Sequence, residues 1–126
     1  FKGVKKGEGK FEWISGASYE GEFANNEIHG FGVHKWPGGK NYRGGWRNNM
    51  MHGEGTLDFG DGKVYVGNFV DDKFHGFGTL KTPDGKEYRG HWEKGKQHGA
   101  GTLVSKDGRE KKGEWRQGTR IRWVEQ

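Results

Sequence analysis

Four histidines stand at a constant spacing of 23 residues: His29, His52, His75 and His98. Imidazole is a common metal ligand and acid–base group, so the series could indicate a metal site or a catalytic centre. The constant spacing favours another interpretation, in which each histidine fills the same structural position in its own repeat. Neighbouring repeats would hold two imidazoles roughly 10 Å apart, whereas zinc ligands lie about 2 Å from the metal. We therefore predict no metal and no cofactor.

Other motifs that would indicate catalysis are missing from the sequence. It contains no Cys, which removes cysteine nucleophiles and thiolate zinc sites together. The glycines around Gly30 and Gly53 do not form the glycine-rich loop before a helix that holds a phosphate group. No serine stands in a nucleophile elbow, and the carboxylates are scattered over expected turns and hairpin ends. We predict that the chain is not an enzyme.

The histidines belong to a 23-residue repeat that occupies the whole chain. Each full unit opens with Tyr, has Gly two positions later and then Phe or Trp after two more; the opening residues are Tyr19, Tyr42, Tyr65 and Tyr88. Each second half reads His-Gly-x-Gly-x-Leu, with His34 once in the place of Leu. The pattern predicts full units at residues 19–41, 42–64, 65–87 and 88–110, a partial unit at 1–18 and a divergent terminal unit at 111–126.

The repeat predicts an all-β fold. Tyr, Gly and the aromatic residue would share one face of a strand, because side chains alternate between faces with a period of 2. We expect a five-residue polar connection within each unit and a tight Asp-Gly or Gly-Gly turn between units. Opposed glycines would leave bare backbone for the aromatic rings, so that one row of rings on one row of glycines forms the core. About ten strands would form a ribbon on the order of 50 Å long.

The pattern Tyr-x-Gly-x-Trp/Phe, His-Gly-x-Gly-x-Leu, Asp-Gly closely resembles the MORN repeat (membrane occupation and recognition nexus) over essentially the whole chain. The resemblance implies an elongated, open single-sheet solenoid of consecutive antiparallel β-hairpins. Such repeats occur in junctophilins, lipid kinases, a histone methyltransferase and membrane-skeleton scaffolds of protists. An array with a divergent last unit is most similar to the carboxy-terminal part of the pure-repeat protist scaffold of the membrane skeleton and basal complex, whose arrays form antiparallel dimers.

The formal net charge of +5 lies at the two ends of the chain. Residues 1–18 carry +2, the four full units carry −1, 0, −1 and +2, and residues 111–126 carry +3. We therefore expect no uniformly basic face, and no nucleic-acid partner. The basic carboxy-terminal end is either a solvated surface or a local site for acidic phospholipid, formed by Arg89, Lys111, Lys112, Arg116, Arg120 and Arg122.

Several apolar residues stand at positions that vary between units. They either pack at the hairpin ends or form an exposed patch that binds a partner, and the parity of Phe31 and Phe77 places these two away from the ring row. The candidate patch consists of Ile28, Phe31, Met50, Met51, Phe74 and Phe77.

Large residues crowd the terminal unit where the repeat has glycine. They either cap the last strand or meet a second copy across a two-fold axis, because a free strand edge must be covered or paired. A homodimer would bring Arg120 and Arg122 near acidic groups such as Glu93 or Glu114 of the other copy. The candidate cap or dimer residues are Trp115, Ile121, Trp123 and Val124.

We predict a non-catalytic scaffold that binds protein, including itself, close to a membrane or the cortical cytoskeleton. The alternatives are a module that binds phosphoinositide or other acidic lipid, and the regulatory repeat arm of a lipid kinase or methyltransferase. No apolar run approaches 18 residues and no signal segment opens the chain, which predicts a cytoplasmic location. Because the sequence begins with Phe1, we expect it to be part of a longer or processed protein.

Overall fold

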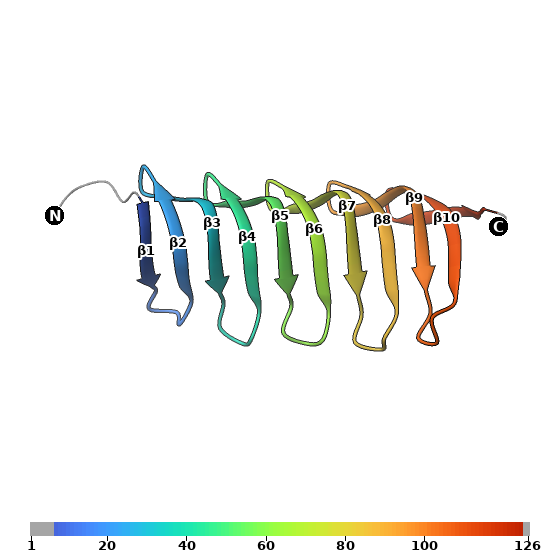
Figure 1. The fold of residues 1–126 in the computed structure, drawn as a ribbon, viewed down its shortest axis with the longest axis horizontal. Helices are drawn as coiled ribbons and strands as arrows, with labels where there is room; N and C mark the ends of the chain where they lie inside the picture. Colours follow the sequence, from blue (N-terminus) through green and yellow to red (C-terminus); the bar gives the residue numbers. More distant parts are fainter. Residues whose placement is uncertain (1–6, 125–126) are drawn as a thin grey trace.

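The computed structural model describes residues 7–124, which form eleven antiparallel β-strands in one open sheet. The strands follow one another along the sheet in sequence order, so β1 and β11 lie at opposite ends of an elongated ribbon (Figure 1). This arrangement confirms the predicted all-β, open single-sheet solenoid of consecutive hairpins. Residues 1–6 of the partial unit and 125–126 of the terminal unit lie outside the described residues.

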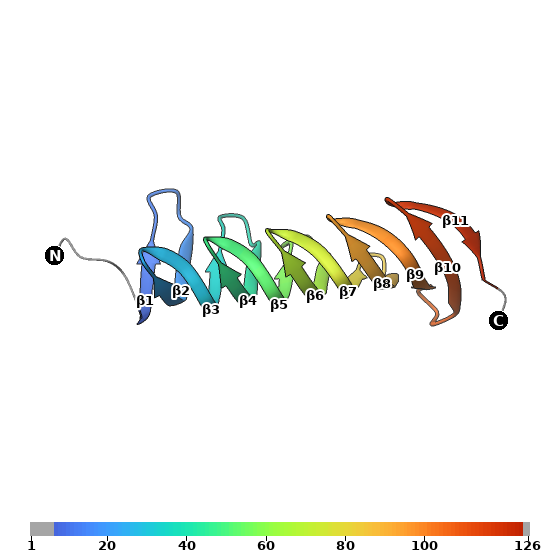
Figure 2. The ribbon, with the colours of Figure 1, turned by 90° about the horizontal axis from the view of Figure 1, so that it is seen from above.

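Successive hairpins repeat one curved shape along the ribbon, as the view from above shows (Figure 2). The strand bounds are β1 (Gly7–Glu12), β2 (Ser18–Ala24), β3 (Glu27–Lys35), β4 (Asn41–Arg47), β5 (Met50–Asp58), β6 (Val64–Val70), β7 (Lys73–Lys81), β8 (Glu87–Glu93), β9 (Lys96–Val104), β10 (Glu110–Arg116) and β11 (Thr119–Trp123).

The tyrosine of each full unit lies on a pair of glycines. In the unit that begins with β4, Gly44 pairs with Gly55 across the ladder. A Cβ atom added to Gly55 would lie 2.1 Å from the Tyr42 hydroxyl oxygen, which no side chain tolerates. The Tyr42 side chain is therefore completely buried on bare backbone. The same arrangement holds at Tyr19, Tyr65 and Tyr88.

The tyrosine hydroxyl also stabilises an irregularity in the ladder. Gly44 pairs with Gly55 and Trp46 with Met51, so Gly45 of β4 faces three residues, 52–54, of β5. The Tyr42 hydroxyl donates to the Gly45 carbonyl at 3.0 Å. Burial raises the pKa of the Tyr42 phenol well above its ordinary value, so the donor keeps its proton. At the bulge Gly53 has φ of 83°, a left-handed conformation that explains the glycine after each histidine.

Aromatic rings connect one unit to the next. The Trp46 ring lies edge-on to Tyr42 of its own unit at 5.1 Å and to Tyr19 of the preceding unit at 5.8 Å. Its indole nitrogen donates to the Gly32 carbonyl at 3.2 Å. Edge-to-face pairs of this kind contribute about 0.5–1.5 kcal/mol beyond their buried area. The expected core of one ring row on glycine backbone is present.

The two kinds of connection are exchanged relative to the sequence prediction. The Asp-Gly and Gly-Gly segments lie in five-residue loops between units, and the Trp36 N–H closes the loop 36–40 by donating to the Lys40 carbonyl at 2.9 Å. Within a unit, β4 and β5 are joined by a two-residue turn at Asn48 and Asn49, with φ of 51° and 65°. Asparagine tolerates this left-handed conformation, so the tight turn needs no glycine.

These two-residue turns also bind the preceding hairpin. The Asn49 N–H donates to the Ile28 carbonyl at 3.1 Å, and the Asn49 side chain accepts the Ile28 N–H at 2.7 Å. Asp72 makes the same two contacts with Met51. Where the second turn residue is glycine, the backbone hydrogen bond is made without the side-chain acceptor, as at Gly95 and Gly118.

Substitutions at two adjacent residues of β6 should destabilise the protein to different extents. A Cβ atom on Gly67 would lie 2.5 Å from the Gly78 Cα, whereas Val66 is 48% exposed on the other face. We expect Gly67→Val to destabilise the protein by about 3 kcal/mol because of overpacking. We expect Val66→Gly to cost about 1 kcal/mol, the usual loss for glycine in a strand. Denaturant titrations compare the two variants, and equal losses would contradict this assignment of faces.

Candidate interaction surfaces

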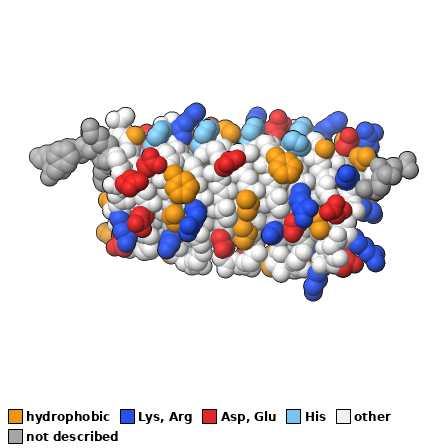
Figure 3. Space-filling model, viewed as in Figure 1, with side chains coloured by type: hydrophobic (Ala, Val, Ile, Leu, Met, Phe, Trp, Pro, Cys, Tyr) orange, Lys and Arg blue, Asp and Glu red, His pale blue; other side chains and the backbone are white. Residues whose placement is uncertain are grey.

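The four equally spaced histidines remain apart in the structure. His29 and His75 are exposed and His52 and His98 are half-buried. Histidine side chains are spread along one long edge of the ribbon (Figure 3). The Nδ1 atom of His98 accepts a hydrogen bond from the Gln117 N–H at 3.3 Å. Within residues 7–124, no three His, Cys, Asp or Glu side chains gather closely enough to hold a metal ion.

His34, which replaces the repeat's leucine, is enclosed by aromatic rings. Its ring centroid lies 4.2 Å from that of Trp36 and 5.8 Å from that of Trp46. Its Nδ1 atom is buried without a hydrogen-bond partner. Burial, together with the positive charge of Lys40, lowers the pKa of His34 below its ordinary value of 6.5. The folded protein therefore favours the neutral imidazole.

The structure divides the predicted apolar patch. Phe31 and Phe77 are 55% and 54% exposed on the face opposite the tyrosine row, which we call the outer face. Met50 is half-buried. The other three members belong to or pack against the aromatic core, so their prediction as exposed residues is wrong: Ile28, Met51 and Phe74. Met51 pairs directly with Trp46, which turns its side chain toward the rings.

A shallow groove of about 600 Å³ lies on the outer face between Phe31 and Phe77. Val66 lines it. Arg43 and Glu54 add one charge of each sign. Part of its lining is backbone without side chains, at Gly44, Gly55 and Gly67. Figure 3 shows hydrophobic and charged side chains interspersed over the ribbon surface.

The large residues of the terminal unit play different roles. Trp115 is only 5% exposed, so the expectation that it meets a second copy is wrong. Trp123 is half-buried and packs edge-on against Trp115, with ring centroids 6.3 Å apart. This contact extends the ring row by one residue, as a cap would. Ile121 and Val124 are 49% and 41% exposed.

Two of the predicted basic residues are paired with acids of their own chain. The Arg122 Nε donates to the Glu114 carboxylate at 2.6 Å. Glu114 therefore already has an arginine partner within its own chain. Arg89 lies 3.1 Å from Glu87 and 3.6 Å from Glu110. Exposed pairs of this kind add little stability, but they reduce the positive charge available to a ligand.

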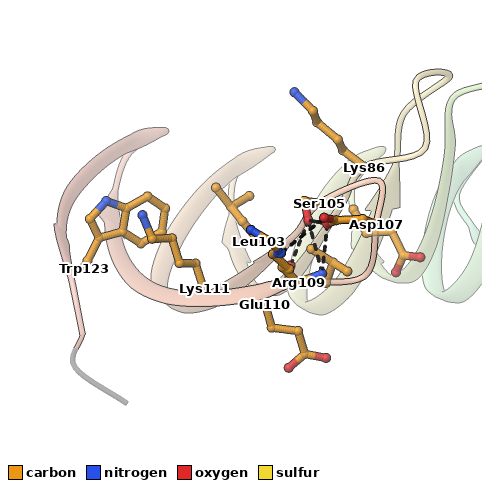
Figure 4. Close-up of a pocket in the computed structure, with 10 residues that line it drawn as sticks. Lys86, Leu103, Ser105, Asp107, Arg109, Glu110, Lys111 and Trp123 are labelled. Atoms are coloured by element: carbon orange, nitrogen blue, oxygen red, sulfur yellow. Dashed lines mark hydrogen bonds and ion pairs between the residues drawn. The ribbon is translucent and has the colours of Figure 1, made fainter.

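The other basic residues lie on different sides of the sheet. The Lys111 Nζ is 4.6 Å from the Trp123 ring centroid and the Arg120 guanidinium is 4.3 Å from it. Lys111 stands where the repeat has tyrosine, and it lines a pocket of about 670 Å³ with Leu103 and Trp123 (Figure 4). Neighbouring strand residues point to opposite faces, so Lys112 cannot join Lys111 in one surface. The six basic residues therefore form no single face; the remaining two are exposed, Lys112 and Arg116.

A comparison with protein-family models matches the MORN repeat at residues 1–18, 19–40, 42–64, 65–87 and 88–108. The chain belongs to the MORN-repeat family. A comparison with curated protein sequences finds no significant match. MORN repeats generally serve as interaction modules associated with proteins or membranes, and the family is generally non-catalytic. Within residues 7–124, there is no helix of the length and apolarity that a membrane span requires.

Sequence reasoning missed several groove residues of this MORN array, including its charged side chains and its central valine. Val66, Arg43 and Glu54 were assigned no role, although all three line the outer face. A signal was available for Glu54, because it stands in the same repeat position as Phe31 and Phe77. The groove as a whole depends on which strands lie beside one another, and only the register shows that.

The buried His34 predicts a loss of stability in mild acid. The unfolded chain takes up a proton near pH 6.5, whereas the folded MORN array resists it, so acidification favours the unfolded state. Stability from this source is complete above that pH and declines below it. We expect His34→Leu, which restores the repeat residue, to reduce the dependence of the melting temperature on pH. Equal acid sensitivity of the parent and His34→Leu would contradict this role.

Proposed function

We propose that this MORN array is a non-catalytic scaffold segment that binds other proteins, and a second copy of itself, near a membrane or the cortical cytoskeleton. We include in this proposal that the chain acts in the same way as the pure-repeat membrane-skeleton scaffolds of protists, which its repeat pattern resembles. The observation that supports it most directly is the outer-face groove, which extends over several units of an unbroken sheet. An extended surface suits protein binding, whereas small-molecule chemistry uses convergent polar groups in a deeper cavity.

Self-association would use the carboxy-terminal units. Ile121 lies on β11 and Val124 directly follows this strand, and both are exposed. Within the described residues, β11 has a strand neighbour on one edge only. A two-fold interface uses one patch twice, so these two exposed apolar residues would contribute four. Arg122 is already paired with Glu114, which lowers the repulsion that symmetry would bring to this basic end.

Light scattering tests self-association directly. We expect the parent to have the mass of a dimer and the double variant Ile121→Ser/Val124→Ser to shift toward monomer with an unchanged melting temperature, because both side chains are exposed. Trp123→Ala should also weaken the dimer, but with a loss of about 2 kcal/mol of stability, since Trp115 loses its cover.

The control is Val66→Ser, which removes an exposed valine remote from this end and should leave the mass unchanged. A monomeric parent at high concentration contradicts self-association. So does a double variant that stays dimeric.

Acidic-lipid binding is a second candidate, favoured by one observation. Lys111 and Arg120 both lie over the Trp123 ring beside the terminal pocket, so two cations and an aromatic surface stand together. Basic residues near an anionic membrane contribute about 1 kcal/mol each. Two such residues support weak attraction only.

This candidate predicts salt-sensitive binding to phosphoinositide vesicles. Exposed charges are screened beyond about 8 Å at physiological ionic strength, so binding should disappear there. Lys111→Glu/Arg120→Glu should abolish it at low salt, and Lys10→Glu, a matched change at the other end of the ribbon, should not. Vesicle sedimentation measures both variants. Tight binding that survives physiological salt would instead make lipid recognition the main function.

A further inference from the structure

One pattern on the outer face spans three units. Phe31, Glu54 and Phe77 occupy the same repeat position on β3, β5 and β7. Two strand spacings separate neighbouring members, so each phenylalanine stands about 10 Å from the carboxylate between them. All three side chains are exposed, and the aromatic core lies on the other face. The fold therefore does not require the alternation of phenylalanine, glutamate and phenylalanine at this repeat position.

The shape of the groove selects an extended ligand. It reaches from β3 to β7, four strand spacings or about 19 Å. Along each strand its outward side chains cover only two successive positions, such as Glu54 and Thr56, which is about 7 Å. An α-helix with side chains is about 10–12 Å wide and does not fit. An extended chain of about six residues, at about 3.3 Å per residue, spans the distance between the two rings.

The middle of the groove lets a ligand backbone approach closely. Gly44, Gly55 and Gly67 line it with backbone atoms only, because the side-chain direction at these three positions points to the tyrosine rings of the other face. Val66, which is 48% exposed, supplies an apolar surface between the two phenylalanines. Apolar side chains of a ligand can therefore be covered at both ends and at the centre.

The charge of this surface favours a basic ligand. A second shallow groove meets the first at Phe31, and together they are lined by four carboxylates and two cations. Phe31 itself lies within this acidic region, because its N–H donates to the Glu22 carboxylate at 2.9 Å. An anionic membrane would be repelled here. The charged residues are Glu8, Glu20, Glu22, Glu54, Lys10 and Arg43.

We propose that the outer-face groove binds an extended basic segment of a partner protein. Two apolar side chains about six residues apart pack against Phe31 and Phe77, and a Lys or Arg between them meets Glu54. This inference rests on the proposed protein-binding function and adds the chemistry of the partner.

Selection from a random peptide library displayed on phage tests the proposal with the whole chain as bait. Enriched peptides should carry two apolar residues about six positions apart with Lys or Arg between them. For a synthetic copy of an enriched peptide, fluorescence anisotropy should show affinity losses of about tenfold for Phe31→Ser and for Phe77→Ser, as expected of central aromatic contacts. Both residues are exposed, so the melting temperature should change little.

Charge and position have separate controls. Glu54→Lys should weaken the same peptide by about tenfold, with a larger loss at low salt. Ile14→Ser removes an exposed apolar residue outside the groove and should leave the affinity unchanged. Vesicles of phosphatidylcholine and phosphatidylserine should not bind in a manner that depends on Phe31 or Phe77.

Three results would overturn the proposal. Enriched peptides that are acidic, or that bind Phe31→Ser and Phe77→Ser as well as the parent, place the binding surface elsewhere while leaving the protein-binding function intact. Phenylalanine-dependent binding to the vesicles makes the ligand a membrane. If no peptide is enriched and light scattering also finds a monomer, both the groove and the scaffold function fail.

Discussion

The fold depends on one contact, a tyrosine ring lying on a pair of glycines. A sheet one layer thick has no second layer to cover its apolar face, so its own side chains must cover it. Tyr42 does so by lying flat on Gly44 and Gly55, and its hydroxyl binds the carbonyl of the bulge that bends the hairpin. The same residue thus supplies apolar cover and satisfies a polar group. Repetition of this contact explains how a chain with few aliphatic residues folds.

Because the tyrosines cover only one face of the sheet, the two faces tolerate substitution differently. On the core face, a side chain added at a glycine collides with a ring or with backbone: a Cβ atom at Gly55 would overlap the Tyr42 side chain. On the outer face, Phe31, Glu54 and Phe77 occupy one repeat position with different chemistry and no cost to the core. The side chains that determine which partner binds can therefore differ from unit to unit on the outer face, while the core residues of the other face stay the same in every unit.

The sequence predicted those features that depend on period and missed those that depend on register. The tyrosine and glycine rows follow from the 23-residue spacing alone. The tight turns were misplaced because Asn48 and Asn49 adopt left-handed conformations without glycine. Met51 was grouped with exposed residues because its contact with Trp46 exists only across the ladder. The groove was invisible for the same reason, since its lining comes from five strands.

The turn contacts between hairpins give the ribbon unequal stiffness along its length. At the two junctions where Asn49 and Asp72 stand, two hydrogen bonds resist the separation of neighbouring hairpins. Gly95 offers one backbone bond, whereas the last turn adds to the Gly118 bond a second one from the Gln117 N–H to His98 Nδ1. A load that bends the ribbon is therefore accommodated mainly at the junction that carries Gly95, between the β6–β7 and β8–β9 hairpins. As a mechanical element the array resembles a strip with one compliant joint, able to follow a curved support.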